Sequence, residues 1–410
     1  MTLEFHKLTE QVDRMGQYFA EQAEETEDKV EIAWQILNAH ADEAFLPYIL
    51  ERVQDAVDKD AGYRGARPID EPITQAYPPA LIPDSATIVA TDGSQIHPNR
   101  HQAAQYYLLN IGTIVVDHGS GEPPLVSSEP YLFYERGYLL SPDFSEIKAT
   151  VVNARRTVAE MAALAEHTWH HRGDARPLIA MLDGGLLFIA TSEVPDRNQL
   201  LGIYFSAMTR LEEVGAGLAG YVDRPRSKFV ARMLHLLDMD AEYVSRNSLG
   251  AEGRLGALQD APIFAQLLHP GERTALFVQM SPQNKEFRRR GGEAQEITFF
   301  YMNVAARDEK PNIVRVEVPM WVANERDLIA EMQALIYLQC QQLASSRFPY
   351  VLTRSHELAI VKREESRQLD TMIQVAMTRH GIPGRASDKE MGKTLTNAVR
   401  RQGMNGRPHG

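Results

Sequence analysis

The sequence has 410 residues, a formal net charge of −12 and one cysteine, Cys340. This length suffices for one large domain or two ordinary ones, and the apolar and charged fractions are those of a globular protein. A single cysteine excludes a disulfide framework and a cysteine-based zinc site. Because the sequence has no apolar stretch long enough to span a membrane and no recognisable signal peptide, we expect a cytoplasmic protein without a membrane partner.

The negative charge is concentrated at the N-terminus. Residues 1–70 contain 16 acidic and 7 basic residues, a balance of −9, so the other 340 residues hold only −3. Residues 381–410 are basic, with six Lys or Arg and two acidic residues. The charge therefore does not exclude a DNA-binding core, although it argues against strong non-specific DNA binding by the isolated chain.

Three regions follow from the pattern of residues along the chain. Apolar residues recur at helical spacing over residues 2–60, opposite a charged face, and this predicts helices. Residues 62–83 are rich in proline and glycine and are typical of a linker. We therefore predict a helical N-terminal region with a Pro-rich linker over 1–83, a main domain over 84–380, and a basic, flexible tail over 381–410.

The main domain is predicted to begin with a buried strand in the segment ATIVATDGS, residues 86–94. The strand should end at Asp92, with Gly93 allowing a sharp turn. Two further strands, a helix that starts at Ser141, and a strand ending in Asp183-Gly184 follow. This order predicts an α/β mixed sheet in which the first and fourth strands are adjacent, as in ribonuclease-H-like folds.

The same patterns predict the remaining elements. The predicted strands before Asp183 cover residues 105–116, 129–135 and 177–183. After Asp183 we predict helices over 196–217 and 227–240, strands over 273–280, 296–304 and 313–321, and helices over 325–345 and 355–380.

Asp92 and Asp183 are the first candidate site residues. Two buried strands that both end in Asp-Gly can place their carboxylates side by side, where like charges repel unless a cation lies between them. Asp-Gly after a strand is equally ordinary turn chemistry, so neither residue alone indicates a site.

A third carboxylate is expected on the helix between the strands, which carries Glu146, Glu160 and Glu166. Glu160 lies among apolar and small residues and is the favoured candidate. Glu166 lies about 240° further around the helix, so both cannot serve one site.

His356 follows a Pro-Tyr turn and is predicted to open a helix. Its imidazole could complete a metal site or position a phosphate, although a lone histidine is more often structural. His167, His170 and His171 have zinc-like spacing, but a solvated helix end explains them better. Gly392-Lys393-Thr394 lacks the leading glycine and the preceding strand of a phosphate loop, so we expect no nucleotide hydrolysis.

Together these segments resemble the NurA nuclease family. The matching segments occur in the family's order and are ATDGS at 90–94, RRTVAE at 155–160, LDGGLL at 182–187, GYVDRPRS at 220–227, VRVEVPMWVA at 314–323 and FPYVLTRSHELA at 348–359. The resemblance implies a ribonuclease-H-like, manganese-dependent deoxyribonuclease that processes DNA ends in double-strand break repair. Magnesium is an alternative, and two ions per site are implied. It also implies a homodimer and a HerA-type hexameric ATPase as partner.

Carried over to this sequence, the resemblance makes Asp92, Asp183 and Glu160 the metal-binding carboxylates and His356 the residue that completes the site. A 5′–3′ exonuclease is the implied activity, with endonuclease cleavage left open. The candidate contacts to DNA phosphates are Arg226, Lys228 and Arg315. Each of them could equally be an ordinary surface cation. Two alternatives stay open: a non-catalytic scaffold that binds a partner through its helical N-terminus, and a metal-dependent phosphatase for small substrates.

Overall fold

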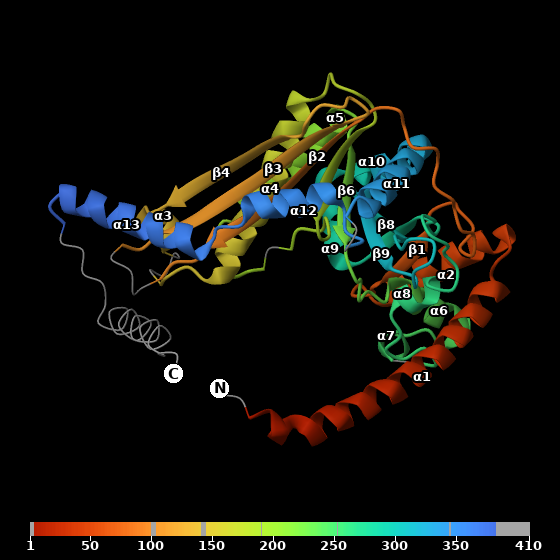
Figure 1. The fold of residues 1–410 in the computed structure, drawn as a ribbon. Coiled ribbons are helices and arrows are strands. Elements are labelled where there is room, and N and C mark those ends of the chain that lie inside the picture. Colours follow the sequence, from red (N-terminus) through yellow and green to blue (C-terminus); the bar gives the residue numbers. More distant parts are fainter. Residues whose placement is uncertain are drawn as a thin grey trace, which may run out of the picture.

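The computed structural model describes residues 4–99, 104–140, 145–189, 191–251, 253–343 and 346–382, and these residues are organised around one mixed sheet (Figure 1). The nine strands have the order β1-β7-β8-β9-β6-β5-β2-β3-β4. Their bounds are β1 (Gly65–Pro68), β2 (Ala86–Ile96), β3 (Tyr107–His118), β4 (Leu125–Phe133), β5 (Leu178–Asp183), β6 (Gly217–Val222), β7 (Phe277–Met280), β8 (Ile297–Asn303) and β9 (Ile313–Pro319).

Half of this sheet has the ribonuclease-H-like arrangement predicted from the sequence. β2, β3 and β4 form an antiparallel meander, while β5 pairs with β2 and β6 pairs with β5 in parallel. The first and fourth strands of the domain are therefore adjacent, as expected. β6 was not predicted, because its sequence GLAGYV is short and contains two glycines, which weakens the strand signal.

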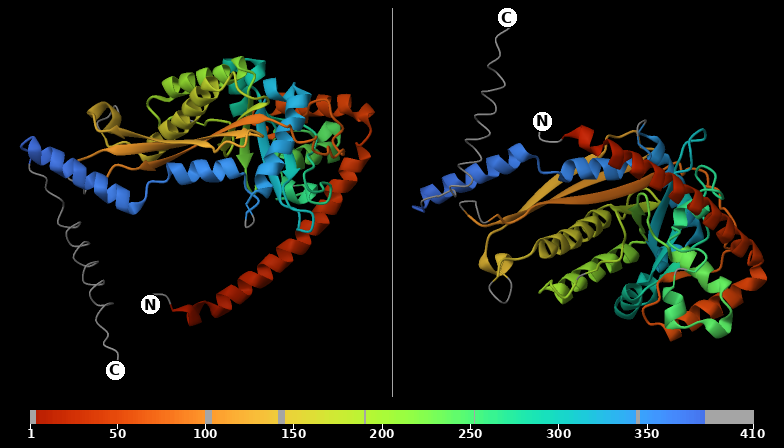
Figure 2. Two further views of the ribbon diagram at one scale, coloured as in Figure 1. Left: turned by 45° about the horizontal axis from the view of Figure 1, so that its top comes forward. Right: turned by 90° about the horizontal axis from the view of Figure 1, so that it is seen from below.

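Helices cover both faces of the sheet (Figure 2). The long helices are α1 (Thr9–Ala39), α2 (Leu46–Lys59), α4 (Ala149–His170), α5 (Arg197–Glu213), α6 (Phe229–Asp238), α9 (Pro282–Gly291), α11 (Arg326–Gln341), α12 (Tyr350–Ala359) and α13 (Arg363–Arg379). Short helices are α3 (Arg136–Leu139), α7 (Arg246–Gly250), α8 (Asp260–Phe264) and α10 (Met320–Ala323), with 3-10 turns at η1 (Phe5–Leu8), η2 (Glu43–Phe45), η3 (Ala241–Tyr243) and η4 (Glu293–Gln295).

The alternation of side chains along β2 shows how the two layers are filled. Val89 packs in the cluster that contains apolar residues of α4 and α5. Its neighbour Ile88 packs in the cluster that contains apolar residues of α11 and α12. Because successive strand residues face opposite sides, an almost continuous apolar run is what a strand with helices on both faces requires.

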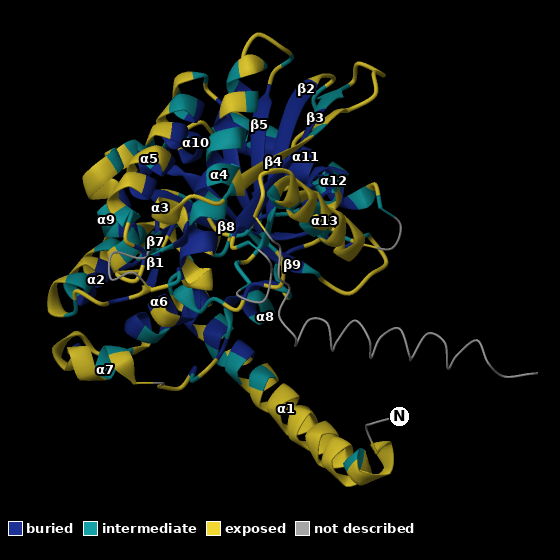
Figure 3. Ribbon diagram, turned by 90° about the vertical axis from the view of Figure 1, so that its left-hand side faces the viewer, coloured by how far each residue is buried: buried dark blue, intermediate teal, exposed yellow. Residues whose placement is uncertain are grey.

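The N-terminal helix is divided between core and solvent. The second half of α1 buries Val30, Ala33, Ile36 and Leu37 in the cluster that contains α2 and α6. The first half projects from the body and is exposed along its length (Figure 3). Its exposed large apolar residues are Val12, Met15, Tyr18 and Phe19, and Phe5 of the preceding η1 is exposed as well. The predicted apolar stripe thus packs on the core only in its C-terminal part.

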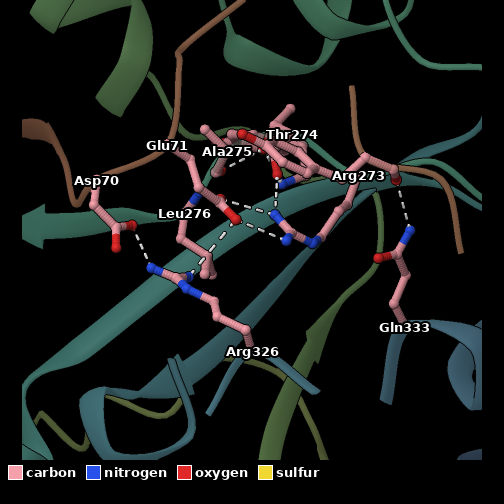
Figure 4. Close-up of polar contacts among 10 residues, drawn as sticks. Asp70, Glu71, Arg273, Thr274, Ala275, Leu276, Arg326 and Gln333 are labelled. Atoms are coloured by element: carbon pink, nitrogen blue, oxygen red, sulfur yellow. Dashed lines mark hydrogen bonds and ion pairs between the residues drawn. The ribbon is translucent and has the colours of Figure 1, made fainter. Parts of the chain in front are cut away.

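The segment predicted as a linker is tied to the sheet. It contains the edge strand β1, and its Glu71 forms a two-pronged ion pair with Arg273, with N–O distances of 2.8 and 2.9 Å. Glu71 also accepts a hydrogen bond from the Leu276 amide at 2.8 Å, and Arg326 pairs with Asp70 (Figure 4). The composition predicts a linker, and composition alone cannot show that Glu71 pairs with residues that are distant in sequence.

Two further sequence expectations need comment. The helix predicted over 355–380 is two helices, α12 and α13, separated at residues 360–362. The predicted helix start at Ser141 and nearly all of the basic tail lie outside the described residues. Among the helices of the described ranges, none is both long and apolar enough to cross a membrane.

Candidate active site

Asp92 and Asp183 lie on neighbouring strands at matching positions. The parallel register of β2 and β5 pairs Thr91 with Leu182, so the next residue on each strand is a carboxylate. Asp183 ends β5, as predicted. Asp92 does not end β2, which continues to Ile96 because β3 pairs with it beyond this point. The predicted turn at Gly93 is therefore wrong.

Gly93 instead allows the helix α4 to approach the strand. A Cβ atom at Gly93 would lie 2.6 Å from Oε1 of Glu160, which no ordinary contact allows. The hydroxyl of Thr91 also donates to the backbone oxygen of Glu160 at 3.0 Å. The missing side chain thus brings the Glu160 carboxylate against the strand that carries Asp92.

The environment of the Glu160 carboxylate disfavours its charged form. Burial raises its pKa to about 8, and the carboxylates of Asp92 and Asp183 add to the increase, while Arg156 and the Gly93 amide oppose it. Its Oε1 atom is buried and accepts no hydrogen bond, although Nε of Arg156 lies 3.1 Å away. A buried carboxylate oxygen without a hydrogen-bond donor is what a cation site in the cation's absence should contain.

The pKa of Asp183 is also affected by neighbouring charges. Burial raises the pKa of its carboxyl, Asp92 raises it further, and His356 opposes the change. Asp223 also raises it, which places a fourth carboxylate near the site. Asp223 was not predicted because the sequence signal of β6 is weak. A strand that ends at Val222 places the next residue at the same sheet edge as Asp183.

His356 reaches the site from the opposite layer of helices. Its Nδ1 donates to Oδ2 of Asp92 at 2.6 Å, and its side chain is 61% exposed. His356 lies in the last turn of α12, which begins at Tyr350, so the prediction that it opens a helix is wrong. Pro349 is the N-cap of α12 and Tyr350 is its first residue, so the Pro-Tyr pair precedes His356 by more than one helical turn.

α12 lies close to β3 because Gly112 has no side chain, and hydrogen bonds hold it there. A Cβ atom at Gly112 would lie 2.5 Å from the Ser355 oxygen. The side chain of Asn110 donates to the Ala359 oxygen at 2.8 Å, and Ser94 donates to the same oxygen at 2.5 Å. These contacts fix the helix end that carries His356.

The donor set suits a divalent cation. Carboxylate oxygens from Asp92, Glu160 and Asp183 with one imidazole are ligands that Mn²⁺ accepts, and Mg²⁺ favours the oxygens. The Glu160 oxygen that accepts no hydrogen bond and the mutual repulsion of the three carboxylates fit a cation between them. Within the described residues, no three His, Cys, Asp or Glu side chains are already close enough to enclose an ion. Binding would therefore draw the ligands together.

The other candidates lie elsewhere. Glu166 is exposed beside His170, with 4.0 Å between the nearest charged atoms, so of the two helix glutamates only Glu160 reaches the site. His171 pairs with Asp174, and His167 lies 3.9 Å from Glu129, so the three histidines of this helix end do not face one another as metal ligands.

Of the three candidate DNA contacts, one is excluded by burial. Only 12% of the Arg315 side chain is exposed, and its Nη2 donates to Oε1 of Glu317 at 2.6 Å, so it is not available to hold a phosphate at the surface. The alternation of β9 turns Arg315 inward, and its charge suggested a surface position. Arg226 is exposed and Lys228 is half-buried just before α6, and both are accessible to an anion.

Comparisons with known proteins found a matching family model and similar solved structures. The sequence matches the NurA domain over residues 86–361. The structure is similar to the NurA nuclease of Sulfolobus solfataricus, with 13% identity, a TM-score of 0.46 and coverage of 86% of this chain and 96% of that chain. It is also similar to the catalytic domain of human Endonuclease V, with 12% identity, a TM-score of 0.33 and coverage of 78% and 95%. A search of curated proteins found no match.

Proposed function

The chain belongs to the NurA family of nucleases, and from this premise we propose that it is a divalent-metal-dependent deoxyribonuclease acting at DNA ends. The observation that carries the proposal is the buried Oε1 of Glu160, which accepts no hydrogen bond and lies beside the carboxylates of Asp92 and Asp183. Such an arrangement is costly in the metal-free protein and becomes favourable when a cation neutralises it.

The residues have separate roles in this proposal. Asp92, Glu160 and Asp183 hold Mn²⁺ or Mg²⁺, with two ions per site. When bound, the metal supplies an activated water near neutral pH and stabilises the charge that develops on the phosphate. Glu160 must release its proton before it can bind, because its pKa is about 8.

His356 orients Asp92 through its 2.6 Å hydrogen bond. Because the imidazole is largely exposed, it is also accessible to a phosphate of the substrate. Arg226 and Lys228 are the remaining candidates to bind neighbouring DNA phosphates, since both are accessible to an anion.

We further propose the biological setting that the family resemblance implies. A chain with a net charge of −12 gains little affinity for DNA from electrostatics, so another protein should hold it on long substrates. A homodimer and a HerA-type ATPase ring in double-strand break repair, with 5′–3′ exonuclease action, meet this need. The exposed apolar residues on the first half of α1 offer a surface for such contacts.

The substrate class decides between this proposal and its alternatives. Purified protein with Mn²⁺ should degrade linear duplex or single-stranded DNA and leave p-nitrophenyl phosphate and mononucleotides intact. Hydrolysis of only the small phosphoesters would favour the phosphatase. Binding of a partner without hydrolysis of any substrate would favour the scaffold. An Asp92→Asn preparation, made in parallel, excludes a contaminating nuclease.

A further inference from the structure

The turn that follows Asp183 is held in place by several hydrogen bonds. The amide of Gly184, at a φ of +103°, donates to the Tyr221 oxygen at 2.7 Å. Two residues later, the amide of Leu186 donates to Oε2 of Glu317 at 2.7 Å. The hydroxyl of Tyr204 donates to the Leu186 oxygen at 2.8 Å. Three hydrogen bonds thus fix the backbone that follows Asp183.

The side chain of Glu317 packs directly against this turn. It lies on β9, opposite Gly220 of β6, and only 2% of its side chain is exposed. A Cβ atom at Gly185 would lie 3.0 Å from Oε2 of Glu317, and one at Gly220 would lie 2.6 Å from the Gly184 oxygen. No side chain lies between the turn and the Glu317 carboxylate, so a displacement of Glu317 must move the turn.

The charge of Glu317 is balanced within the protein. Its Oε1 accepts from Arg315 at 2.6 Å, and the guanidinium of Arg315 lies 5.3 Å from the ring centre of Phe229. A carboxylate this deeply buried is retained only where its hydrogen bonds are satisfied. Here one oxygen is bound by the arginine and the other by the turn.

We propose that Glu317 is a positioning residue for the nuclease reaction: through the Leu186 amide it holds the turn 184–186, and thereby Asp183, in the geometry that binds metal. The proposal rests on the proposed function, because it assigns Asp183 to a metal site. Groups that orient metal ligands from behind commonly change metal affinity or activity by about 10- to 100-fold when they are mutated.

Two substitutions separate the hydrogen bond from the charge. Glu317→Asp keeps the charge beside Arg315 but shortens the side chain, so the carboxylate withdraws from the Leu186 amide. Glu317→Gln loses the charge but keeps an oxygen that can accept from this amide. A purely structural ion pair would be damaged more by glutamine, whereas a positioning role would be damaged more by aspartate.

The protein contains a matched control pair far from Asp183 in sequence. Glu71 also pairs with a buried arginine, Arg273, and also accepts from a leucine amide, that of Leu276, at 2.8 Å (Figure 4). Glu71→Asp and Glu71→Gln therefore make the same chemical changes without touching the turn at 184–186.

The experiment measures Mn²⁺ affinity by electron paramagnetic resonance, hydrogen exchange of the peptide covering 183–189, and kcat and KM for DNA cleavage. We expect Glu317→Asp to weaken Mn²⁺ binding by about tenfold or more, to lower kcat with little change in KM, and to speed exchange at Leu186. Glu317→Gln should stay closer to wild type in all three. Both Glu71 variants should lower the melting temperature without changing Mn²⁺ affinity.

The proposal is overturned if Glu317→Asp binds Mn²⁺ as tightly as the Glu71 variants do, or if the turn exchanges no faster than in wild type. It is also overturned if Glu317→Gln is the more damaging change in metal affinity. Failure of the proposed function has a different signature, since wild-type protein would then neither bind Mn²⁺ nor cleave DNA. The exchange rate at Leu186 would still show whether Glu317 holds the turn.

Discussion

At the scale of single residues, the site consists of carboxylates that repel one another. Asp92 and Asp183 occupy neighbouring strand positions, and Glu160 is brought against them from α4. Asp92→Asn and Asp183→Asn should each reduce cleavage more than about 100-fold, because metal binding contributes several kcal/mol to the transition state. The metal-free variants should melt no lower than wild type, since a repelling charge is removed. Cleavage assays and thermal melts check this; near-normal cleavage by either variant would remove it from the site.

Glu160 should make the stability of the metal-free protein depend on pH. Its pKa rises from an ordinary 4.5 to about 8 on folding, so the folded protein binds a proton that the unfolded chain releases. Its contribution to stability is full below the unfolded pKa and is lost as the pH rises toward the folded pKa. Melting temperatures between pH 5 and 8 should therefore fall more steeply in wild type than in Glu160→Gln.

Glu166→Gln is the control for this prediction, because Glu166 is exposed on the same helix. It should retain the wild-type pH dependence and near-normal cleavage, whereas Glu160→Gln should lose both. Identical pH profiles in the three proteins would show that Glu160 is not protonated in the folded state.

Arg315 and Arg226 should differ in what their removal affects. Arg315→Ala leaves Glu317 as an unpaired buried charge and should cost about 3–5 kcal/mol of unfolding free energy. Arg226→Ala should leave stability within about 0.5 kcal/mol of wild type, because the side chain is exposed. Urea unfolding measures both. If Arg315→Ala is as stable as wild type but binds DNA more weakly, Arg315 contacts DNA after all.

At the scale of elements, the apolar runs of β2 and β5 were sufficient to predict two buried strands, and the order of the elements predicted that these strands are adjacent. They were not sufficient to show that β2 continues past Asp92, because that depends on pairing with β3. The role of Gly93 was misread for the same reason: a glycine needed for close approach of a helix has the same sequence signature as one needed for a turn. The resemblance to the NurA family, by contrast, was confirmed.

The two halves of α1 should respond differently to mutation. Met15→Glu and Phe19→Glu lie on the exposed half and should change the free energy of unfolding by no more than about 0.5 kcal/mol. Leu37→Ala lies in the core and should cost about 2–5 kcal/mol. If the exposed stripe is a contact surface, the two glutamate variants should also lose self-association in light scattering or binding of the ATPase. A large loss of stability in Phe19→Glu would place this half of the helix against the core.

At the scale of the whole molecule, the site combines residues that are far apart in sequence. Strand and helix patterns predicted Asp92, Asp183 and Glu160, and the family resemblance added a role for His356. In the structure Asp92 and Asp183 occupy neighbouring strand positions, Glu160 lies near both, and His356 hydrogen-bonds to Asp92. The sequence pattern did not single out Asp223 or Glu317, since the place of each depends on a strand pairing, of β6 with β5 and of β9 with β6. The inward direction of Arg315 likewise depends on which face of β9 is covered.

The central claim is that the carboxylates of Asp92, Glu160 and Asp183 form the metal site of a DNA nuclease. The most direct test is digestion of end-labelled linear DNA with Mn²⁺, Mg²⁺ or a chelator, using wild-type protein and Asp92→Asn purified in parallel. We predict that wild-type protein shortens the DNA only when a divalent metal is present, and that Asp92→Asn does not shorten it with either metal. Cleavage that persists in the chelator, or that is equal in the two proteins, would contradict the claim.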